Sequence, residues 1–98
     1  MAGYRLTSLA KEDLRNIWRY TANEWSREQA DKYYDGLFLV FDAIADGRVT
    51  GKPVDRIFSG LKRAVFVKHY VFFRNVEDDI VEITRVLHVR MDVKNQLR

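Results

Sequence analysis

Residues 61–87, LKRAVFVKHYVFFRNVEDDIVEITRVL, decide the fold. They contain three runs rich in the residue types that strands favour: Leu61–Val67, Tyr70–Val76 and Ile80–Leu87. Glu77-Asp78-Asp79 is a tight polar turn, so the last two runs form a hairpin. Lys68-His69 is either a second tight turn or part of one longer, bent strand. Residues 70–73 are apolar on both faces, which predicts a sheet with helices on one face and partial cover on the other.

A strand and a helix precede this region. Tyr4-Arg5-Leu6-Thr7 alternates like a short strand, and it must join the later sheet because a lone strand leaves its backbone groups without partners. Thr7 or Ser8 then caps a helix from about residue 10 to about residue 23. Its apolar stripe has helical spacing and consists of Leu14, Ile17, Trp18 and Thr21.

A second helix begins at a capping box, Ser26-Arg27-Glu28-Gln29. Trp25 and Ala30 stand where a hydrophobic staple would form, and Gly47 is suited to end the helix. Its apolar face consists of Tyr33, Tyr34, Leu37, Phe38, Phe41, Ile44 and Ala45. The short link between the two helices makes them an antiparallel hairpin. Gly36 is expected to let the partner helix approach closely.

Residues 47–60 hold three of the five glycines and the only proline, which predicts an exposed loop. Asp92 is suited to cap a final short helix through Leu97. The predicted order is β-α-α-β-β-β, an α+β fold with an antiparallel-rich sheet packed on a helical hairpin and a short C-terminal helix. At 98 residues, the chain is expected to form a single domain over 1–98.

Composition narrows the range of functions. There is no cysteine, and the two histidines, His69 and His88, are far apart in sequence, so neither a metal site nor any other cofactor is predicted. No apolar run approaches the roughly 20 residues that span a bilayer, so no membrane partner and a cytoplasmic location are expected. Residues 1–60 carry nine basic and nine acidic side chains, and residues 61–98 carry eight and five. The excess charge of +3 therefore lies in the second part, which is compatible with an acidic protein, a phosphate surface or plain solvation.

The chain resembles the RelE/ParE superfamily of bacterial toxin–antitoxin toxins, and the ParE branch in particular. The similarity covers essentially the whole chain, and its most specific motif is Arg85-Val86-Leu87-His88 followed by Met91-Asp92. The other matching segments are Tyr4-Arg5-Leu6-Thr7, Ala10 with Asp13-Leu14 and Ile17, Tyr20-Thr21, Trp25 with Gln29-Ala30, Gly60-Leu61-Lys62-Arg63, and His69-Tyr70-Val71-Phe72-Phe73-Arg74. The resemblance implies a toxin that inhibits DNA gyrase by binding and is neutralised by a ParD-like antitoxin in a hetero-oligomeric complex.

The resemblance also raises an alternative, a ribosome-dependent mRNA endoribonuclease of the RelE type. Such cleavage needs a proton acceptor, a proton donor and cations against the phosphate. Tyr70 stands where those nucleases carry a strand arginine, and no Tyr or His follows His88. A cation set can still be assembled, with His88 as the only nearby titratable group; it consists of Lys62, Arg63, Arg74, Arg85 and Arg90. No acid–base pair is evident, so we predict no catalytic residue and favour a non-enzymatic inhibitor.

We expect the target to be contacted through the C-terminal end of the last strand, by Arg85, His88, Arg90 and Met91. Arg85 is also a candidate for an architectural role, paired with a carboxylate such as Glu82 or Asp92, because an unpaired buried charge is costly. The antitoxin is expected on the exposed aromatics of the helical hairpin, nominated as Trp18, Trp25, Tyr33 and Tyr34, or at a free sheet edge. Each aromatic could equally be core. No helix carries a row of cations for a DNA groove, so sequence-specific DNA binding is not predicted.

Overall fold

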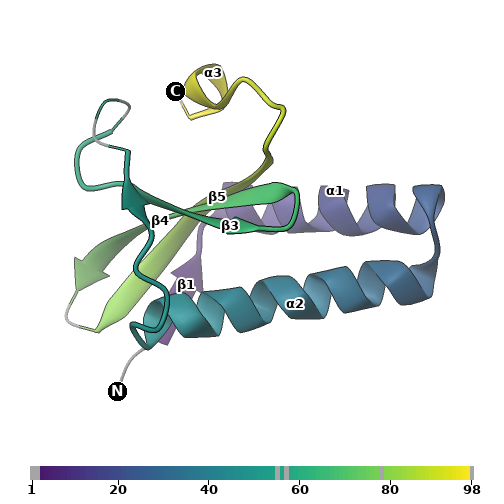
Figure 1. The fold of residues 1–98 in the computed structure, drawn as a ribbon, viewed down its shortest axis with the longest axis horizontal. Helices are drawn as coiled ribbons and strands as arrows, with labels where there is room; N and C mark the ends of the chain where they lie inside the picture. The colour runs from purple at the N-terminus through teal and green to yellow at the C-terminus, as the bar shows by residue number, and fades with distance from the viewer. Residues whose placement is uncertain (1–2, 55, 57, 78, 98) are drawn as a thin grey trace.

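The computed structural model describes residues 3–54, 56, 58–77 and 79–97. Its elements follow the predicted order with one addition, the two-residue strand β2 (Figure 1). They are β1 (Gly3–Leu6), α1 (Ser8–Glu24), α2 (Arg27–Ala45), β2 (Lys52–Pro53), β3 (Lys62–Phe66), β4 (His69–Glu77), β5 (Ile80–His88) and α3 (Val93–Gln96). The predicted α+β class is confirmed.

The five strands form one mixed sheet in the order β1-β5-β4-β3-β2. β1 runs parallel to β5, and the other neighbouring strands are antiparallel. The first strand therefore joins the later sheet, as its lack of any other backbone partner required. The β4–β5 ladder has two irregularities, between Phe72 and Phe73 and between Asn75 and Glu77. The two irregularities shift the pairing of residues 73–75 by one position, and from Phe72 to His69 the register is again that of the Glu77–Ile80 pair.

Both long helices start where the sequence predicts. The Thr7 hydroxyl accepts the Ala10 N–H at 3.0 Å, and the Ser26 hydroxyl accepts the Gln29 N–H at 3.0 Å. Thr7 also donates its hydroxyl hydrogen to the Thr84 carbonyl at 2.7 Å, so the start of α1 is tied to β5. Removing either cap would cost about 1 kcal/mol.

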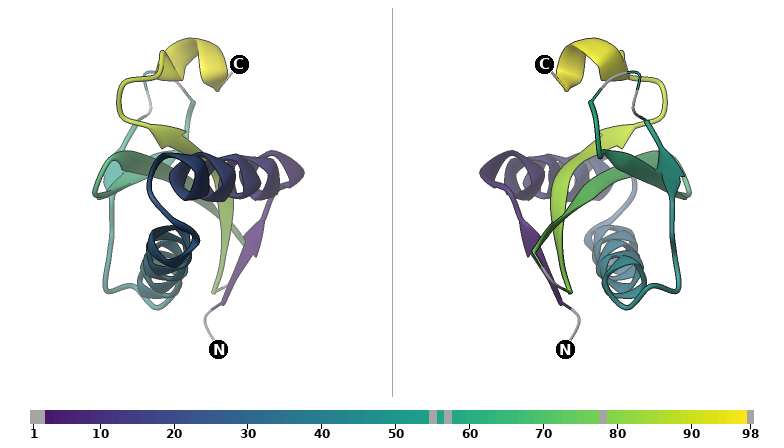
Figure 2. Two further views of the ribbon diagram at one scale, coloured as in Figure 1. Left: turned by 90° about the vertical axis from the view of Figure 1, so that its right-hand side faces the viewer. Right: turned by 90° about the vertical axis from the view of Figure 1, so that its left-hand side faces the viewer.

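The helical hairpin covers one face of the sheet, and smaller elements cover the other. On the hairpin side the core includes Leu14, Leu37, Phe41 and Ile83, each at most 2 % exposed. On the opposite side Leu61, Phe72 and Leu87 are packed under Val54, Tyr70, Val93 and Leu97. In Figures 1 and 2, α2 lies below the sheet and α3 above it. The predicted two-sided sheet is confirmed.

Three local expectations were wrong. Gly36 makes room for a strand and not for the partner helix, because an added Cβ would lie 2.5 Å from Cζ of Phe66 on β3. Residues 47–60 are not all loop, since Lys52 and Pro53 pair with β3 as an edge strand, a place where proline is tolerated. Trp25 remains 74 % exposed, so no staple buries it.

Candidate functional site

The C-terminal end of β5 leads into a turn, residues 88–91, which we call the tail turn. His88 Nδ1 accepts the Arg90 N–H at 3.1 Å, and the His88 carbonyl accepts the Met91 N–H at 3.0 Å. The Val89 N–H donates to the Lys68 carbonyl at 2.9 Å, which links the turn to the one between β3 and β4. The Arg90 side chain is exposed, and Met91 is 44 % exposed. The backbone is held while these two side chains stay available.

Arg85 belongs to a different environment. Its Nε and Nη2 donate to the two carboxylate oxygens of Asp13 on α1, at 2.8 and 2.9 Å, and Nη1 donates to the Gln96 carbonyl at 2.8 Å. Asp13 also accepts the Val86 N–H at 3.0 Å. The side-chain hydrogen bonds between Arg85 and Asp13 raise the pKa of Arg85. Only 15 % of the Arg85 side chain is exposed. Arg85 therefore joins β5 to α1 and α3.

The partner expected for Arg85 was wrong. Glu82 is occupied by Arg5 at 3.2 Å and by Arg74 at 3.1 Å. Asp92 accepts the Asn95 N–H at 3.5 Å and caps α3, as predicted. Asp13 takes the role because α1 crosses β5 at that point, a long-range contact between residues 72 positions apart. Sequence spacing contains no signal for it.

His69 is a residue that the sequence did not nominate. It pairs with His88 across the β4–β5 ladder, with ring centroids 5.3 Å apart, so His88 is not the only titratable group there. Tyr33 Oη lies 2.6 Å from His69 Nδ1. Burial, followed by the charge of His88, lowers the pKa of His69 to about 4, so its ring is neutral at physiological pH. The sequence held one indication of this pair. If Glu77 and Ile80 flank the turn of a regular hairpin, His69 and His88 lie opposite one another, each eight residues from its end of the turn, and the two irregularities leave that pairing unchanged.

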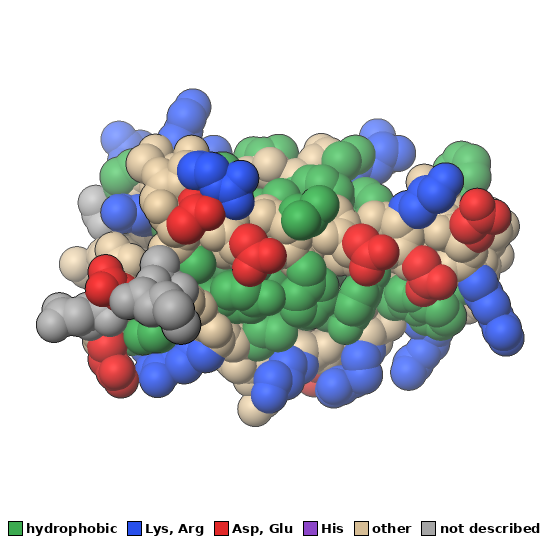
Figure 3. Space-filling model, turned by 90° about the horizontal axis from the view of Figure 1, so that it is seen from below, with side chains coloured by type: hydrophobic (Ala, Val, Ile, Leu, Met, Phe, Trp, Pro, Cys, Tyr) green, Lys and Arg blue, Asp and Glu red, His purple; other side chains and the backbone are tan. Residues whose placement is uncertain are grey.

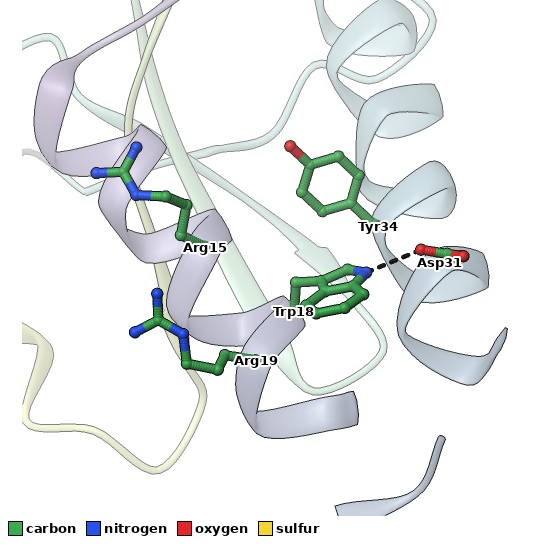
Figure 4. A pocket seen from close by; sticks show the side chains of 5 residues that line it. All are labelled: Arg15, Trp18, Arg19, Asp31 and Tyr34. Atoms are coloured by element: carbon green, nitrogen blue, oxygen red, sulfur yellow. Dashed lines mark hydrogen bonds between the residues drawn. The ribbon is translucent and has the colours of Figure 1, made fainter. Parts of the chain in front are cut away.

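The four aromatic residues nominated on the helical hairpin do not form one surface. Trp18 and Tyr34 line a cavity of about 400 Å³ between α1 and α2, with Arg15, Arg19 and Asp31 (Figure 4). We call it the interhelical cavity. The Trp18 indole N–H crosses it and donates to Asp31 Oδ1 at 2.9 Å. Trp25 follows the end of α1 and is largely exposed, whereas Tyr33 is turned toward His69.

The two helices beside this cavity differ in charge: α2 exposes more acidic than basic side chains, and α1 exposes more basic than acidic ones. The exposed acidic residues of α2 are Glu28, Asp31, Asp35 and Asp42, and the exposed basic residues of α1 are Lys11, Arg15 and Arg19. Figure 3, which looks at the α2 side, shows a hydrophobic band between acidic and basic side chains. A band of this kind suits a partner segment that is apolar on one face and charged at its edges.

A second cavity, of about 310 Å³, opens on the other face of the sheet. Its lining includes Arg74, Glu82 and Arg85. Both arginines are bound to carboxylates, Arg74 to Glu82 and Arg85 to Asp13. Arg63 of the neighbouring strand stands 4.4 Å from the ring centroid of Tyr70. Three members of the cation set, Arg63, Arg74 and Arg85, therefore already have partners, whereas the Arg90 side chain is exposed.

In the part of the chain that the structure describes, no helix is long and apolar enough to cross a membrane. Among the same residues, no group of three or more His, Cys, Asp or Glu side chains is arranged to hold a metal ion.

The fold is one seen in a toxin–antitoxin system. A solved structure described as "Chromosomal ParDE TA system from P. aeruginosa" superimposes with a TM-score of 0.77 over 92 % of this chain and 98 % of that one, at 19 % identity. A family model described as "ParE toxin of type II toxin-antitoxin system, parDE" matches residues 4–93. The chain belongs to the ParE toxin family.

Individual relatives agree with this assignment. The chain is 38 % identical to toxin ParE1 of Caulobacter vibrioides, over 99 % of both chains. It is 34 % identical to toxin ParE of Escherichia coli over 99 % of this chain and 94 % of that toxin, and 32 % identical to toxin ParE1 of Mycobacterium tuberculosis over 96 % of each. As a ParE toxin of a type II system, it has an antitoxin as its partner.

Proposed function

We propose that this ParE toxin inhibits DNA gyrase by binding to it in the cytoplasm, and that a ParD-like antitoxin neutralises it. The observation that carries the proposal is the tail turn, which presents Arg90 and Met91 to solvent on a backbone held by hydrogen bonds. A preorganised loop with an exposed cation and an exposed apolar side chain is suited to contacting a protein surface, because little ordering is needed on binding.

The engaged cations argue against the endoribonuclease alternative. A nuclease needs cations free to face the phosphate and an acid–base pair beside them. Arg74 and Arg85 are paired with Glu82 and Asp13, and the two histidines of the sequence are His88 and a half-buried, neutral His69. Freeing either arginine would expose its partner carboxylate to the same substrate phosphate. This arrangement favours contact over catalysis.

The interhelical cavity supports the antitoxin part of the proposal. An amphipathic antitoxin helix could insert apolar side chains beside Trp18 and Tyr34. Its charged edges would meet Arg15 and Arg19 on one side and the acidic row of α2 on the other. Trp25 lies at the end of the same hairpin and could extend the contact. Tyr33, whose hydroxyl is engaged with His69, is left out of this surface.

The test is a supercoiling assay with purified gyrase, run beside a cleavage assay on ribosome-bound messenger RNA. We expect the wild-type toxin to block supercoiling and to leave the messenger intact. The double variant Arg90→Gln/Met91→Ala should raise the half-inhibitory concentration at least about tenfold, the usual effect of removing an interface anchor. A matched control, Lys52→Gln/Leu39→Ala, removes one exposed cation and one exposed apolar side chain elsewhere. Messenger cleavage with supercoiling untouched would reverse the proposal.

A further inference from the structure

Three rings from three elements form a connected set next to the tail turn. Tyr33 comes from α2, His69 from the start of β4 and His88 from the end of β5. The contacts run from Tyr33 Oη to His69 Nδ1 at 2.6 Å, then between the two imidazole rings at 5.3 Å, and finally from His88 Nδ1 to the Arg90 N–H at 3.1 Å. We call this set the ring cluster. It links α2 to the segment that presents Arg90.

A second route connects Tyr33 to the same turn. Its hydroxyl donates to the Phe66 carbonyl at 3.3 Å and accepts the Lys68 N–H at 3.4 Å. The Lys68 carbonyl in turn accepts the Val89 N–H at 2.9 Å. One phenol oxygen therefore fixes both the β3–β4 turn and His69, and each of these contacts one residue of the tail turn.

The surroundings make these contacts effective. The Tyr33 ring packs edge-on against Phe66 and His69, with centroids 5.0 and 5.4 Å away. Burial raises the pKa of Tyr33 and lowers that of His69, so both groups are neutral at physiological pH. Neutral groups in a partly buried site depend on their mutual hydrogen bonds, because water cannot easily replace a lost partner. The cluster should therefore respond to the loss of a single oxygen atom.

We propose that Tyr33 and His69 are positioning residues that hold the tail turn in the conformation in which it meets its target. The inference rests on the proposed function, since the target contacts are assigned to that turn. It gives Tyr33 a role opposite to the one the sequence suggested, because Tyr33 would support the target-facing end and not the antitoxin-facing groove. His88 then connects His69 to the tail turn, and Arg90 is the residue whose position is fixed.

The decisive variant is Tyr33→Phe, which removes the hydroxyl and keeps the ring. We expect the half-inhibitory concentration against gyrase to rise at least about fivefold, because one lost hydrogen bond typically gives that factor and the hydroxyl contacts His69, Phe66 and Lys68. Affinity for the antitoxin should stay within about twofold, as expected of a residue outside that interface. The matched control is Tyr4→Phe, a half-buried tyrosine packed on Phe41 whose hydroxyl makes no hydrogen bond within the described part of the chain. Equal inhibition by both variants would refute the proposal.

Two readouts separate positioning from general loss of structure. Amide hydrogen exchange at Arg90 and the His88 ring nitrogen shifts should change in Tyr33→Phe, but not in Tyr4→Phe. His69→Asn, whose side-chain amide can take the place of Nδ1, should retain inhibition that His69→Leu loses. If wild-type toxin fails to inhibit gyrase, the proposed function fails, yet the exchange measurement still decides this inference. Unchanged exchange at Arg90 in Tyr33→Phe would overturn it.

Discussion

Arg85 and Arg90 stand five residues apart in the same C-terminal stretch and have opposite environments. Arg85 makes three side-chain hydrogen bonds, to Asp13 and to the Gln96 carbonyl, and is mostly buried. The Arg90 side chain is exposed, and among the described residues its contact is the hydrogen bond from its backbone N–H to His88 Nδ1. The same residue type thus fixes the architecture at one position and is free to contact a partner at the other. Environment, and not residue type, decides which of the two can bind a target.

The largest expected effect comes from removing the partner of Arg85. Asp13→Ala leaves a mostly buried guanidinium without its carboxylate and the Val86 N–H without its acceptor, which should cost about 3 kcal/mol of unfolding free energy. Urea denaturation measures the loss. The control is Asp31→Ala, an exposed carboxylate on α2, which should cost less than about 1 kcal/mol.

A double variant sharpens this result. Asp13→Ala/Arg85→Met removes both charges and keeps an apolar side chain, so it should be more stable than Asp13→Ala alone. If Asp13→Ala were as stable as the wild type, Arg85 would not be an architectural residue, and it would return to the set of possible target contacts.

The contrast between the two arginines also explains what the sequence could predict. Local features were predictable, because capping at Ser26 and at Asp92 depends on neighbouring residues only. The pairing of Arg85 with Asp13 was not, since it depends on where α1 crosses β5. The strand β2 was missed because two exposed residues carry no periodic pattern. The opposition of His69 and His88 required the register of a hairpin with two irregularities.

The next prediction concerns α3, whose Gln96 carbonyl binds Arg85. Leu97 and Val93 pack on Leu61, Phe72 and Leu87, and the Gln96 carbonyl accepts from Arg85. Leu97→Ala should cost about 1–2 kcal/mol, less than a fully buried leucine because this one is only partly covered. Thermal unfolding followed by circular dichroism measures the loss. Leu39→Ala, a leucine that is 68 % exposed on α2, is the control and should be nearly neutral.

The third prediction concerns His69, which contacts His88 in the turn that carries Arg90. It is tested by the dependence of the unfolding free energy on pH. His69 titrates near 6.5 when unfolded and near 4 when folded, so below about pH 6.5 the unfolded chain binds a proton that the folded chain does not. Stability should therefore fall as the pH drops from about 7 to 5. The cause is burial and the neighbouring His88, opposed by Asp13. Because His69 is only partly buried, we expect a loss of about 1 kcal/mol and not the full linkage value.

The measurement compares the wild type with His69→Asn, which cannot titrate, by urea denaturation at pH 7 and pH 5. Carboxylates common to both proteins contribute equally, so the difference between the two pH dependences isolates His69. The wild type should lose more stability than the variant over this interval. An equal loss in both would mean that His69 titrates normally and that the ring cluster is solvated.

The smallest expected effect on stability is that of Arg90→Gln. Comparing it with Arg85→Gln tests directly whether the two arginines have different roles. Its side chain is exposed, so the unfolding free energy should change by less than about 0.5 kcal/mol. Arg85→Gln is the matched variant and should lose about 2–3 kcal/mol, because Asp13 is left partly buried without its cation. Both are measured by urea denaturation, and the soluble Arg90→Gln protein is then assayed against gyrase. If the two variants were equally stable, the two arginines would share one role. If Arg90→Gln keeps its fold but loses inhibition, the free arginine is the one that acts.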